Sequence, residues 1–111
     1  DTEIKPDNKI VADIKAQKLG GVLLYEKNIT KTNSVENLKK LITKLRKEAT
    51  LPLLVSIDEE GGKVNRLKTK YGFPATVSAK YLGDLNDVAS TKYFSDIIAH
   101  NLLQLGINVI E

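Results

Sequence analysis

The residues best suited to chemistry lie together in one short stretch of the chain. It contains three adjacent carboxylates, two glycines and two cations: Asp58, Glu59, Glu60, Gly61, Gly62, Lys63 and Arg66. Neighbouring acids repel one another where the dielectric constant is low, so at least one is expected to point inward and to be held by a partner. Arg66 is a candidate partner, because a guanidinium group can bind a carboxylate or several hydroxyls in a planar fork. The alternative is a charged surface turn, in which the acids pair with Lys63 and Arg66 in solvent.

Other ligand classes find less support in the same residues. Carboxylates suit a hard cation, but the spacing of an EF-hand loop is absent, and no P-loop lysine follows the glycines at the required distance. The chain has no cysteine, which excludes disulfides and thiolate metal sites. We therefore expect no metal and no cofactor, and a metal or phosphate site at Asp58, Glu59 and Glu60 is the less favoured hypothesis.

The acidic stretch follows a segment that is predicted to be a buried strand. Gly21–Tyr25 and Leu51–Ile57 are apolar on both faces, as strands of a parallel sheet are, and Pro52 is tolerable only at the start of its strand. Between them, apolar residues at helical spacing predict a helix: Val35, Leu38, Leu41, Ile42 and Leu45. Asn33 and Glu36 fit a capping box at its start. Strand, helix and strand form a βαβ unit, so the predicted fold class is α/β with parallel strands.

The flanking segments extend this pattern. They are predicted to be, in chain order, a short helix, a polar loop, a long helix and the beginning of a third strand: Asn8–Leu19, 58–78, Asn86–Leu105 and Ile107–Ile110. Gly20 and Gly106 end the two helices. In parallel α/β folds the ligand binds beyond the carboxyl ends of the strands. Asp58 stands at such an end.

The stretch Ile57–Leu67 also resembles a known family motif. It is similar to the pattern D-x-E-G-G-x-V-x-R-[LF] of glycoside hydrolase family 3, in its bacterial β-N-acetylglucosaminidase (β-hexosaminidase) branch. Further blocks resemble that family in the same order: Gly20–Tyr25 with Asn28-Ile29, Phe73-Pro74, and Leu105–Asn108. The resemblance therefore extends over nearly the whole chain.

The resemblance implies a role for each residue of the motif. Asp58 and Arg66 are implied to bind hydroxyls of the sugar at the position where the glycosidic bond is cut, and such a site rejects sugars that lack those hydroxyls. Gly61 and Gly62 are expected to form a structural turn. Glu60 is expected to buttress that turn or to pair with a neighbouring cation.

The family's own catalytic groups have no counterpart in this sequence. The resemblance implies removal of terminal β-linked N-acetylhexosamine from cell-wall or chitin-type sugars with retention, using an aspartate nucleophile from a later strand and a histidine acid/base from a later loop. His100 lies on the polar side of its predicted helix, and we interpret it as a surface residue. Asn101 stands where the family commonly has a glutamate, and a neutral amide is easier to bury. We expect the isolated chain to be inactive; the alternative is a non-catalytic sugar-binding or structural barrel fragment.

The resemblance also implies the domain organisation. Residues 1–111 are expected to be the N-terminal fragment of a (β/α)8 TIM-type barrel domain, truncated after the start of strand three, since a closed barrel usually needs roughly 250 residues. Open sheet edges should make the fragment self-associate or depend on the remainder of the barrel. Carbohydrate is the expected substrate.

The composition limits the remaining partners. With 41% hydrophobic and 28% charged residues, the chain has the composition of a globular protein. Much of the net charge of +3 comes from residues that we interpret as a solvated helix face and not as a nucleic-acid site: Lys39, Lys40, Lys44, Arg46 and Lys47. No apolar run approaches the roughly 20 residues of a membrane span. The chain begins at Asp1 and contains no Met, so we expect that an upstream segment was removed, and a cytoplasmic or exported location both remain open.

Overall fold

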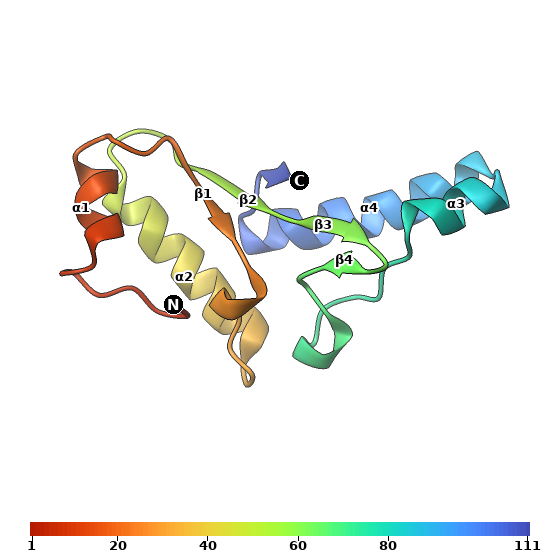
Figure 1. Ribbon diagram of the computed structural model, residues 1–111, viewed down its shortest axis with the longest axis horizontal. Coiled ribbons are helices and arrows are strands. Elements are labelled where there is room, and N and C mark those ends of the chain that lie inside the picture. Colours follow the sequence, from red (N-terminus) through yellow and green to blue (C-terminus); the bar gives the residue numbers. More distant parts are fainter.

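A three-stranded parallel sheet forms the centre of the computed structural model, which describes all 111 residues (Figure 1). The strands β1 (Gly21–Leu24), β2 (Leu54–Ile57) and β5 (Val109–Ile110) lie in the order β1-β2-β5. Both neighbouring pairs are parallel, and Leu24 lies opposite Ile57 at the carboxyl ends of β1 and β2. The predicted α/β class and the parallel strands are confirmed.

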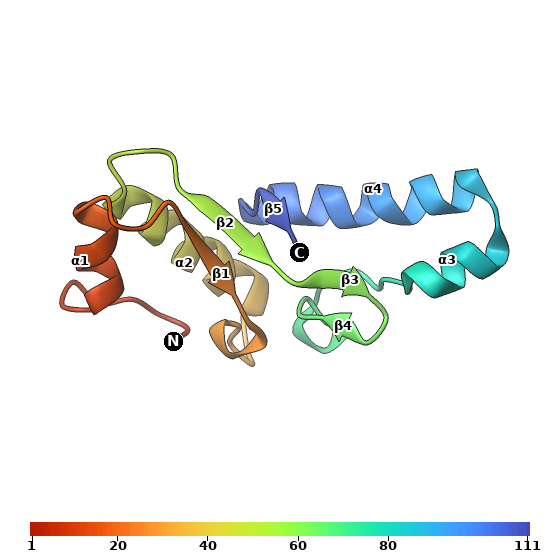
Figure 2. The ribbon, with the colours of Figure 1, turned by 45° about the horizontal axis from the view of Figure 1, so that its top comes forward.

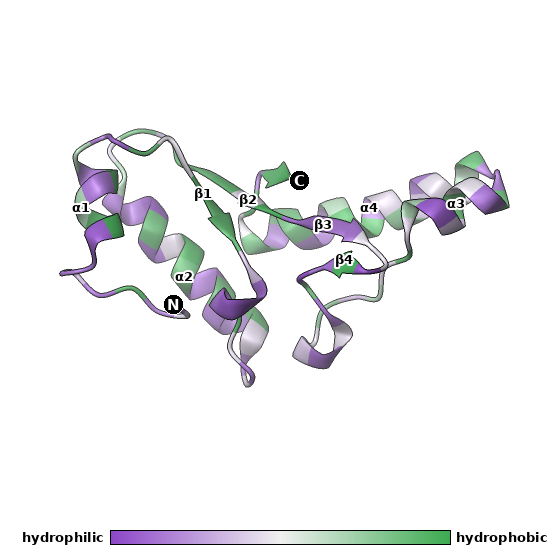
Figure 3. Cartoon of the chain, in the orientation of Figure 1, coloured by the Kyte–Doolittle hydropathy of each residue, from purple (hydrophilic) through white to green (hydrophobic).

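Two helices cover one face of this sheet. α2 (Ser34–Glu48) connects β1 to β2, and α4 (Val88–Leu105) precedes β5 and contacts α2. Buried side chains of the strands and of both helices join in one core: Leu24, Val55, Ile57, Leu38, Leu41, Ile42, Leu45, Leu102 and Leu105. Figure 2 shows α2 behind β1 and β2, and Figure 3 shows that these two strands are largely apolar. The amphipathic helix predicted between the first two strands is therefore present.

The opposite face of the sheet is covered by neither helix. Successive side chains of a strand point to opposite faces, so Leu23, Leu54 and Ser56 point away from the core that Val55 and Ile57 enter. Leu54 is 55% exposed. Parallel sheets normally bury both faces, and this one leaves apolar residues open on one of them.

A helical arm extends away from the sheet (Figure 1). It consists of α3 (Ala79–Leu85) and the first part of α4, and the molecule measures 48 × 28 × 20 Å. Ser78 and Asp87 cap the two helices, because their side-chain oxygens accept hydrogen bonds from the N–H groups of Tyr81 and Ser90 at 3.1 and 2.9 Å. The remaining elements are short: α1 (Lys9–Lys15), η1 (Glu26–Asn28), β3 (Glu59–Gly61), β4 (Val64–Asn65) and η2 (Thr69–Tyr71). None of the helices combines the length and the apolar content needed to cross a bilayer.

The start of α2 differs from the predicted capping box. Asn33 has a left-handed backbone with a φ of 48°, and its side chain makes no capping hydrogen bond. Instead, Ser34 Oγ donates to the carbonyl oxygen of Thr30 at 2.5 Å, and Asn37 Nδ2 donates to Thr30 Oγ1 at 3.2 Å. The capping-box prediction was wrong because the loop before the helix turns back and binds the first turn with its own polar groups.

Other boundaries also differ from the prediction. The first helix ends at Lys15 and not at Leu19, because Gln17 adopts a left-handed φ of 58°. The segment predicted as a polar loop contains the β3–β4 hairpin and η2. The helix α3 was not predicted; it is only seven residues long and none of its residues is buried.

Gly106→Ala is expected to lower the free energy of unfolding by about 1–2 kcal/mol, because Gly106 ends α4 with a φ of 85° that alanine adopts only under strain. An added Cβ would also lie 3.3 Å from Cγ2 of Ile42. Gly83→Ala in α3 is the matched control: an added Cβ meets nothing within 4 Å there, so alanine should raise helix stability by up to about 1 kcal/mol. Urea unfolding measures both free energies, and a change of the same sign in the two variants would contradict the role assigned to Gly106.

Candidate functional site

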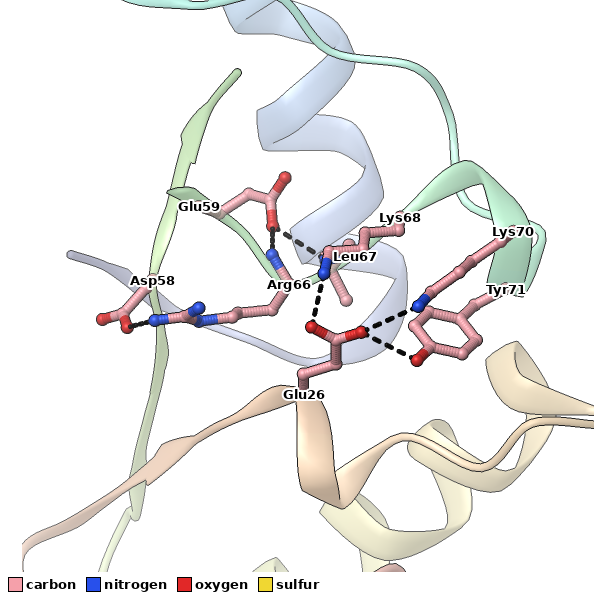
Figure 4. A network of polar contacts seen from close by, with 8 residues as sticks. All are labelled: Glu26, Asp58, Glu59, Arg66, Leu67, Lys68, Lys70 and Tyr71. Carbon is pink, nitrogen blue, oxygen red and sulfur yellow. Dashed lines mark hydrogen bonds and ion pairs between the residues drawn. The ribbon is translucent and has the colours of Figure 1, made fainter. Parts of the chain in front are cut away.

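A hairpin at the carboxyl end of β2 brings Asp58 and Arg66 together (Figure 4). Asp58 directly follows β2, and the antiparallel pairing of β3 with β4 returns the chain so that Arg66 lies beside it. Nη2 of Arg66 is 2.5 Å from Oδ2 of Asp58, and the two side chains are 29% and 23% exposed. The hydrogen bond to Asp58 raises the pKa of Arg66. The structure therefore places the two residues that the resemblance singled out in direct contact.

Gly61 and Gly62 make the turn of this hairpin. Their φ angles of 78° and 60° are left-handed. A Cβ on Gly61 would lie 2.1 Å from the carbonyl oxygen of Val77, and one on Gly62 would lie 2.6 Å from Cβ of Ser78. The turn thus packs its backbone directly against the segment that leads into α3, and neither position has room for a side chain.

Glu59 is the acid that points inward. The alternation of side chains along β2 continues through the hairpin, so Asp58 points to the uncovered face of the sheet and Glu59 to the covered one. Glu59 is 2% exposed, and its Oε2 accepts hydrogen bonds from the backbone N–H groups of Arg66 at 3.1 Å and Leu67 at 3.0 Å. Its Oε1 has no partner, and burial raises the pKa of Glu59. An inward acid was predicted, but main-chain groups hold it and not the Arg66 guanidinium.

Glu60 stays on the surface of the hairpin. Its side chain is exposed and forms no hydrogen bond or ion pair. Glu60 makes no ion pair in this structure, and Glu59 is the acid that binds main-chain N–H groups of the hairpin. The three neighbouring acids do not converge, and no group of three or more His, Cys, Asp or Glu side chains could hold a metal ion.

Another carboxylate reaches the site from the carboxyl end of β1. Glu26, in η1, accepts hydrogen bonds from Lys68 Nζ at 2.5 Å and from the Tyr71 hydroxyl at 2.8 Å, and Lys70 Nζ lies 3.1 Å away (Figure 4). The hydrogen bond from Lys68, followed by those from Tyr71 and Lys70, lowers the pKa of Glu26 to about 2. Sequence reasoning missed Glu26, because Lys68 and Tyr71 are 42 and 45 residues away and no local pattern signals such a contact.

An apolar cleft of about 570 Å³ lies elsewhere, between the hairpin, α3, α4 and β5. Its lining includes Glu60 and several apolar side chains: Val77, Leu82, Val88, Phe94, Ile98 and Ile110. Neither Asp58 nor Arg66 lines it, so the paired polar groups and the cleft are separate features. On the same helix His100 is exposed, as predicted, with its Nε2 3.0 Å from Nε2 of Gln104.

Comparison with known proteins places this fold and hairpin in a family. A sequence model described as the glycosyl hydrolase family 3 N terminal domain matches residues 1–110. The chain belongs to this family. The β-hexosaminidase of Bordetella pertussis is 41% identical to the family 3 chain over 69 residues, which are 62% of this chain and 18% of that protein. β-Hexosaminidase A of Pseudoalteromonas piscicida is 30% identical over 102 residues, which are 86% of this chain and 17% of that protein.

A solved structure shares the fold of the family 3 chain. The glycoside hydrolase family 3 β-N-acetylglucosaminidase from Paenibacillus sp. FPU-7 superimposes with a TM-score of 0.82 at 29% identity, covering 93% of this chain and 20% of that one. The chain spans about a fifth of the length of the curated relatives named above. The family resemblance carried by Ile57–Leu67 and the other blocks is confirmed.

Glu59→Gln is expected to make the stability of the protein less dependent on pH. The unfolded carboxyl group titrates at its ordinary pKa of 4.5, and burial raises the pKa of Glu59 in the folded state. The folded state therefore holds the proton more tightly, and the resulting stabilisation is complete below about pH 4.5 and is lost as the pH rises through the raised pKa. Glutamine keeps a carbonyl acceptor for the N–H groups of Arg66 and Leu67 but does not titrate.

Urea unfolding between about pH 4 and about pH 8 measures this effect. The free energy of unfolding of the wild type, minus that of the variant, should fall as the pH increases. Glu60→Gln, the same substitution at the exposed neighbouring residue, is the control and should leave the profile unchanged. Parallel profiles for wild type and Glu59→Gln would contradict the prediction. Glu26, whose pKa is lowered to about 2 in the folded state, contributes the same pH dependence to wild type and variant and therefore cancels from the difference between them.

Proposed function

We propose that the family 3 chain is the first part of a retaining glycoside hydrolase that releases terminal β-linked N-acetylhexosamine from cell-wall or chitin-type sugars. Asp58 and Arg66 bind hydroxyls of the sugar at the cleaved linkage. The observation that carries the proposal is their 2.5 Å contact at the carboxyl end of a parallel strand, which is the end where barrel enzymes bind substrate. The names of the relatives, β-hexosaminidase and β-N-acetylglucosaminidase, support this class of sugar.

The charge of the pair favours a neutral polyhydroxyl ligand over an anion. A lone arginine would attract a carboxylate or phosphate, but Arg66 is neutralised by Asp58 at 2.5 Å. The pair still offers both hydrogen-bond donors and acceptors, because Nη1 of Arg66 and Oδ1 of Asp58 form no hydrogen bond within the chain. Adjacent hydroxyls of a sugar ring are groups that both donate and accept.

The uncovered face of the sheet supports the barrel part of the proposal. The three strands follow one another in chain order, and α2 and α4 cover one face only. In a (β/α)8 barrel the helices lie outside and the other face of the sheet turns inward. Residues 1–111 then form the N-terminal part of the barrel domain, and Asp58, which points to the uncovered face, lies at its mouth.

The nucleophile and the acid/base come, in this proposal, from strands and loops outside these residues. Among the acids near the pair, Glu59 is buried against main-chain N–H groups and Glu26 is bound to three donors. His100 is exposed on α4. Each is therefore occupied or remote, and none stands ready to attack an anomeric carbon or to protonate a leaving oxygen.

Asp58→Asn and Arg66→Lys are each expected to lower kcat/KM for p-nitrophenyl N-acetyl-β-D-glucosaminide by roughly 10- to 100-fold in the full-length protein, because each removes charge-assisted hydrogen bonds to hydroxyls. Release of p-nitrophenol is the measurement. Asp84→Asn is the control, since Asp84 is an exposed aspartate paired with Lys80 at 2.7 Å on α3. If both site variants hydrolyse the substrate like the control, the assigned role is wrong. Purified residues 1–111 alone should release no p-nitrophenol.

The isolated chain is also expected to self-associate, because β1 and β5 are unpaired edges of a parallel sheet. Sedimentation velocity should show species larger than a monomer. Leu54→Lys places a charge on the uncovered face, where Leu54 is 55% exposed, and should reduce association. A compact monomer of the unmodified chain over a wide concentration range would contradict this expectation.

A further inference from the structure

We propose that Glu26 is a positioning residue for Arg66, an inference that rests on the sugar-binding role proposed above for Asp58 and Arg66. Glu26 stands at the end of β1, the strand that pairs with β2. Its carboxylate binds three donors, and all three belong to the five residues that follow Arg66: Lys68, Lys70 and Tyr71. Glu26, in the loop after β1, thereby binds the segment that follows Arg66 in the chain.

This contact complements the one made by Glu59. The backbone N–H groups of Arg66 and Leu67 are bound by Glu59 from the covered side of the sheet. Glu26 binds the next residues from the side of β1, as Figure 4 shows. With the chain held on both sides of Arg66, the backbone from which the guanidinium extends is fixed, and its Nη2 meets Oδ2 of Asp58 at 2.5 Å.

Glu26 also controls which cation reaches Asp58. Lys68 follows Arg66 by two residues and carries the same positive charge. Lys68 and Arg66 are therefore potential competitors for one carboxylate. Glu26 pairs with Lys68 at 2.5 Å and with Lys70 at 3.1 Å, which leaves Asp58 to Arg66. The electrostatic contribution of Glu26 to Arg66 acts in the same direction as the hydrogen bond from Asp58 in raising the pKa of the guanidinium.

A purely stabilising surface network would behave differently. The side chains of Glu26, Lys68 and Lys70 are 31%, 38% and 60% exposed, and ion pairs of this exposure contribute little to folding. Loss of the Glu26 charge should then change the melting temperature only slightly. If Glu26 positions Arg66, the same substitution should lower catalytic efficiency by more than the change in stability explains.

Glu26→Gln in the full-length protein tests this distinction. We expect kcat/KM for p-nitrophenyl N-acetyl-β-D-glucosaminide to fall about tenfold, while the melting temperature stays within about 2 °C of wild type. The matched control is Glu36→Gln, which removes an exposed glutamate that pairs with Lys40 at 3.8 Å on α2. It should leave kcat/KM within about twofold of wild type. An effect of Glu26→Gln no larger than that of the control would overturn the inference.

Combination with Arg66→Lys separates positioning from a general structural effect. If Glu26 acts through the Arg66 guanidinium, Glu26→Gln should cause no further loss of kcat/KM in the Arg66→Lys background. The same tenfold loss in both backgrounds would mean that Glu26 acts independently of Arg66, and the inference would be wrong. Failure of the proposed function looks different: Asp58→Asn and Arg66→Lys would then leave kcat/KM unchanged, which would overturn the site and this inference together.

Discussion

Two main-chain hydrogen bonds to one buried carboxylate oxygen hold the hairpin on which the candidate site depends. Glu59 Oε2 accepts from the N–H groups of Arg66 and Leu67, and Glu59 itself is 2% exposed. Because the carboxylate belongs to the residue directly after Asp58, this contact fixes the distance between the two ends of the hairpin. The glycine turn completes the constraint, since it fits against the segment before α3 only without side chains. The contact between Asp58 and Arg66 is a consequence of these backbone restraints.

The pleat of the parallel sheet decides which acid has which environment. Along β2, Val55 and Ile57 enter the core beneath α2 and α4, while Leu54 and Ser56 face the other side. The alternation continues past the end of the strand, so that the side chain of Asp58 points to the uncovered face. Two adjacent carboxylates that would repel each other are thus turned in opposite directions. The same geometry places the polar pair above the face of the sheet that the helices leave open.

Much of the fold could be predicted because its signals are local. Apolar runs marked β1 and β2, helical spacing marked α2, and the motif brought Asp58 and Arg66 together within one short hairpin. The contact of Glu26 with Lys68 could not be predicted, because it depends on the pairing of two strands distant in sequence. Errors arose where local rules competed: Asn33 has the spacing of a capping residue, but its backbone is left-handed and its side chain makes no capping hydrogen bond. Repulsion among the acids indicated that one must be buried but not which one.

Three carboxylates surround the segment that carries Arg66, and their partners determine which of them can act on a ligand. Glu26 is ionised over the whole neutral range, with a pKa of about 2, but its charge is matched by two lysines. Glu59 is occupied by main-chain N–H groups, and burial raises its pKa. Asp58 is partly exposed and pairs with Arg66 alone. The net charge at the proposed sugar site therefore depends on all three acids. If the lysines lost their pairing with Glu26, or if Glu59 became exposed, the charge near the ligand would change although Asp58 and Arg66 would stay the same.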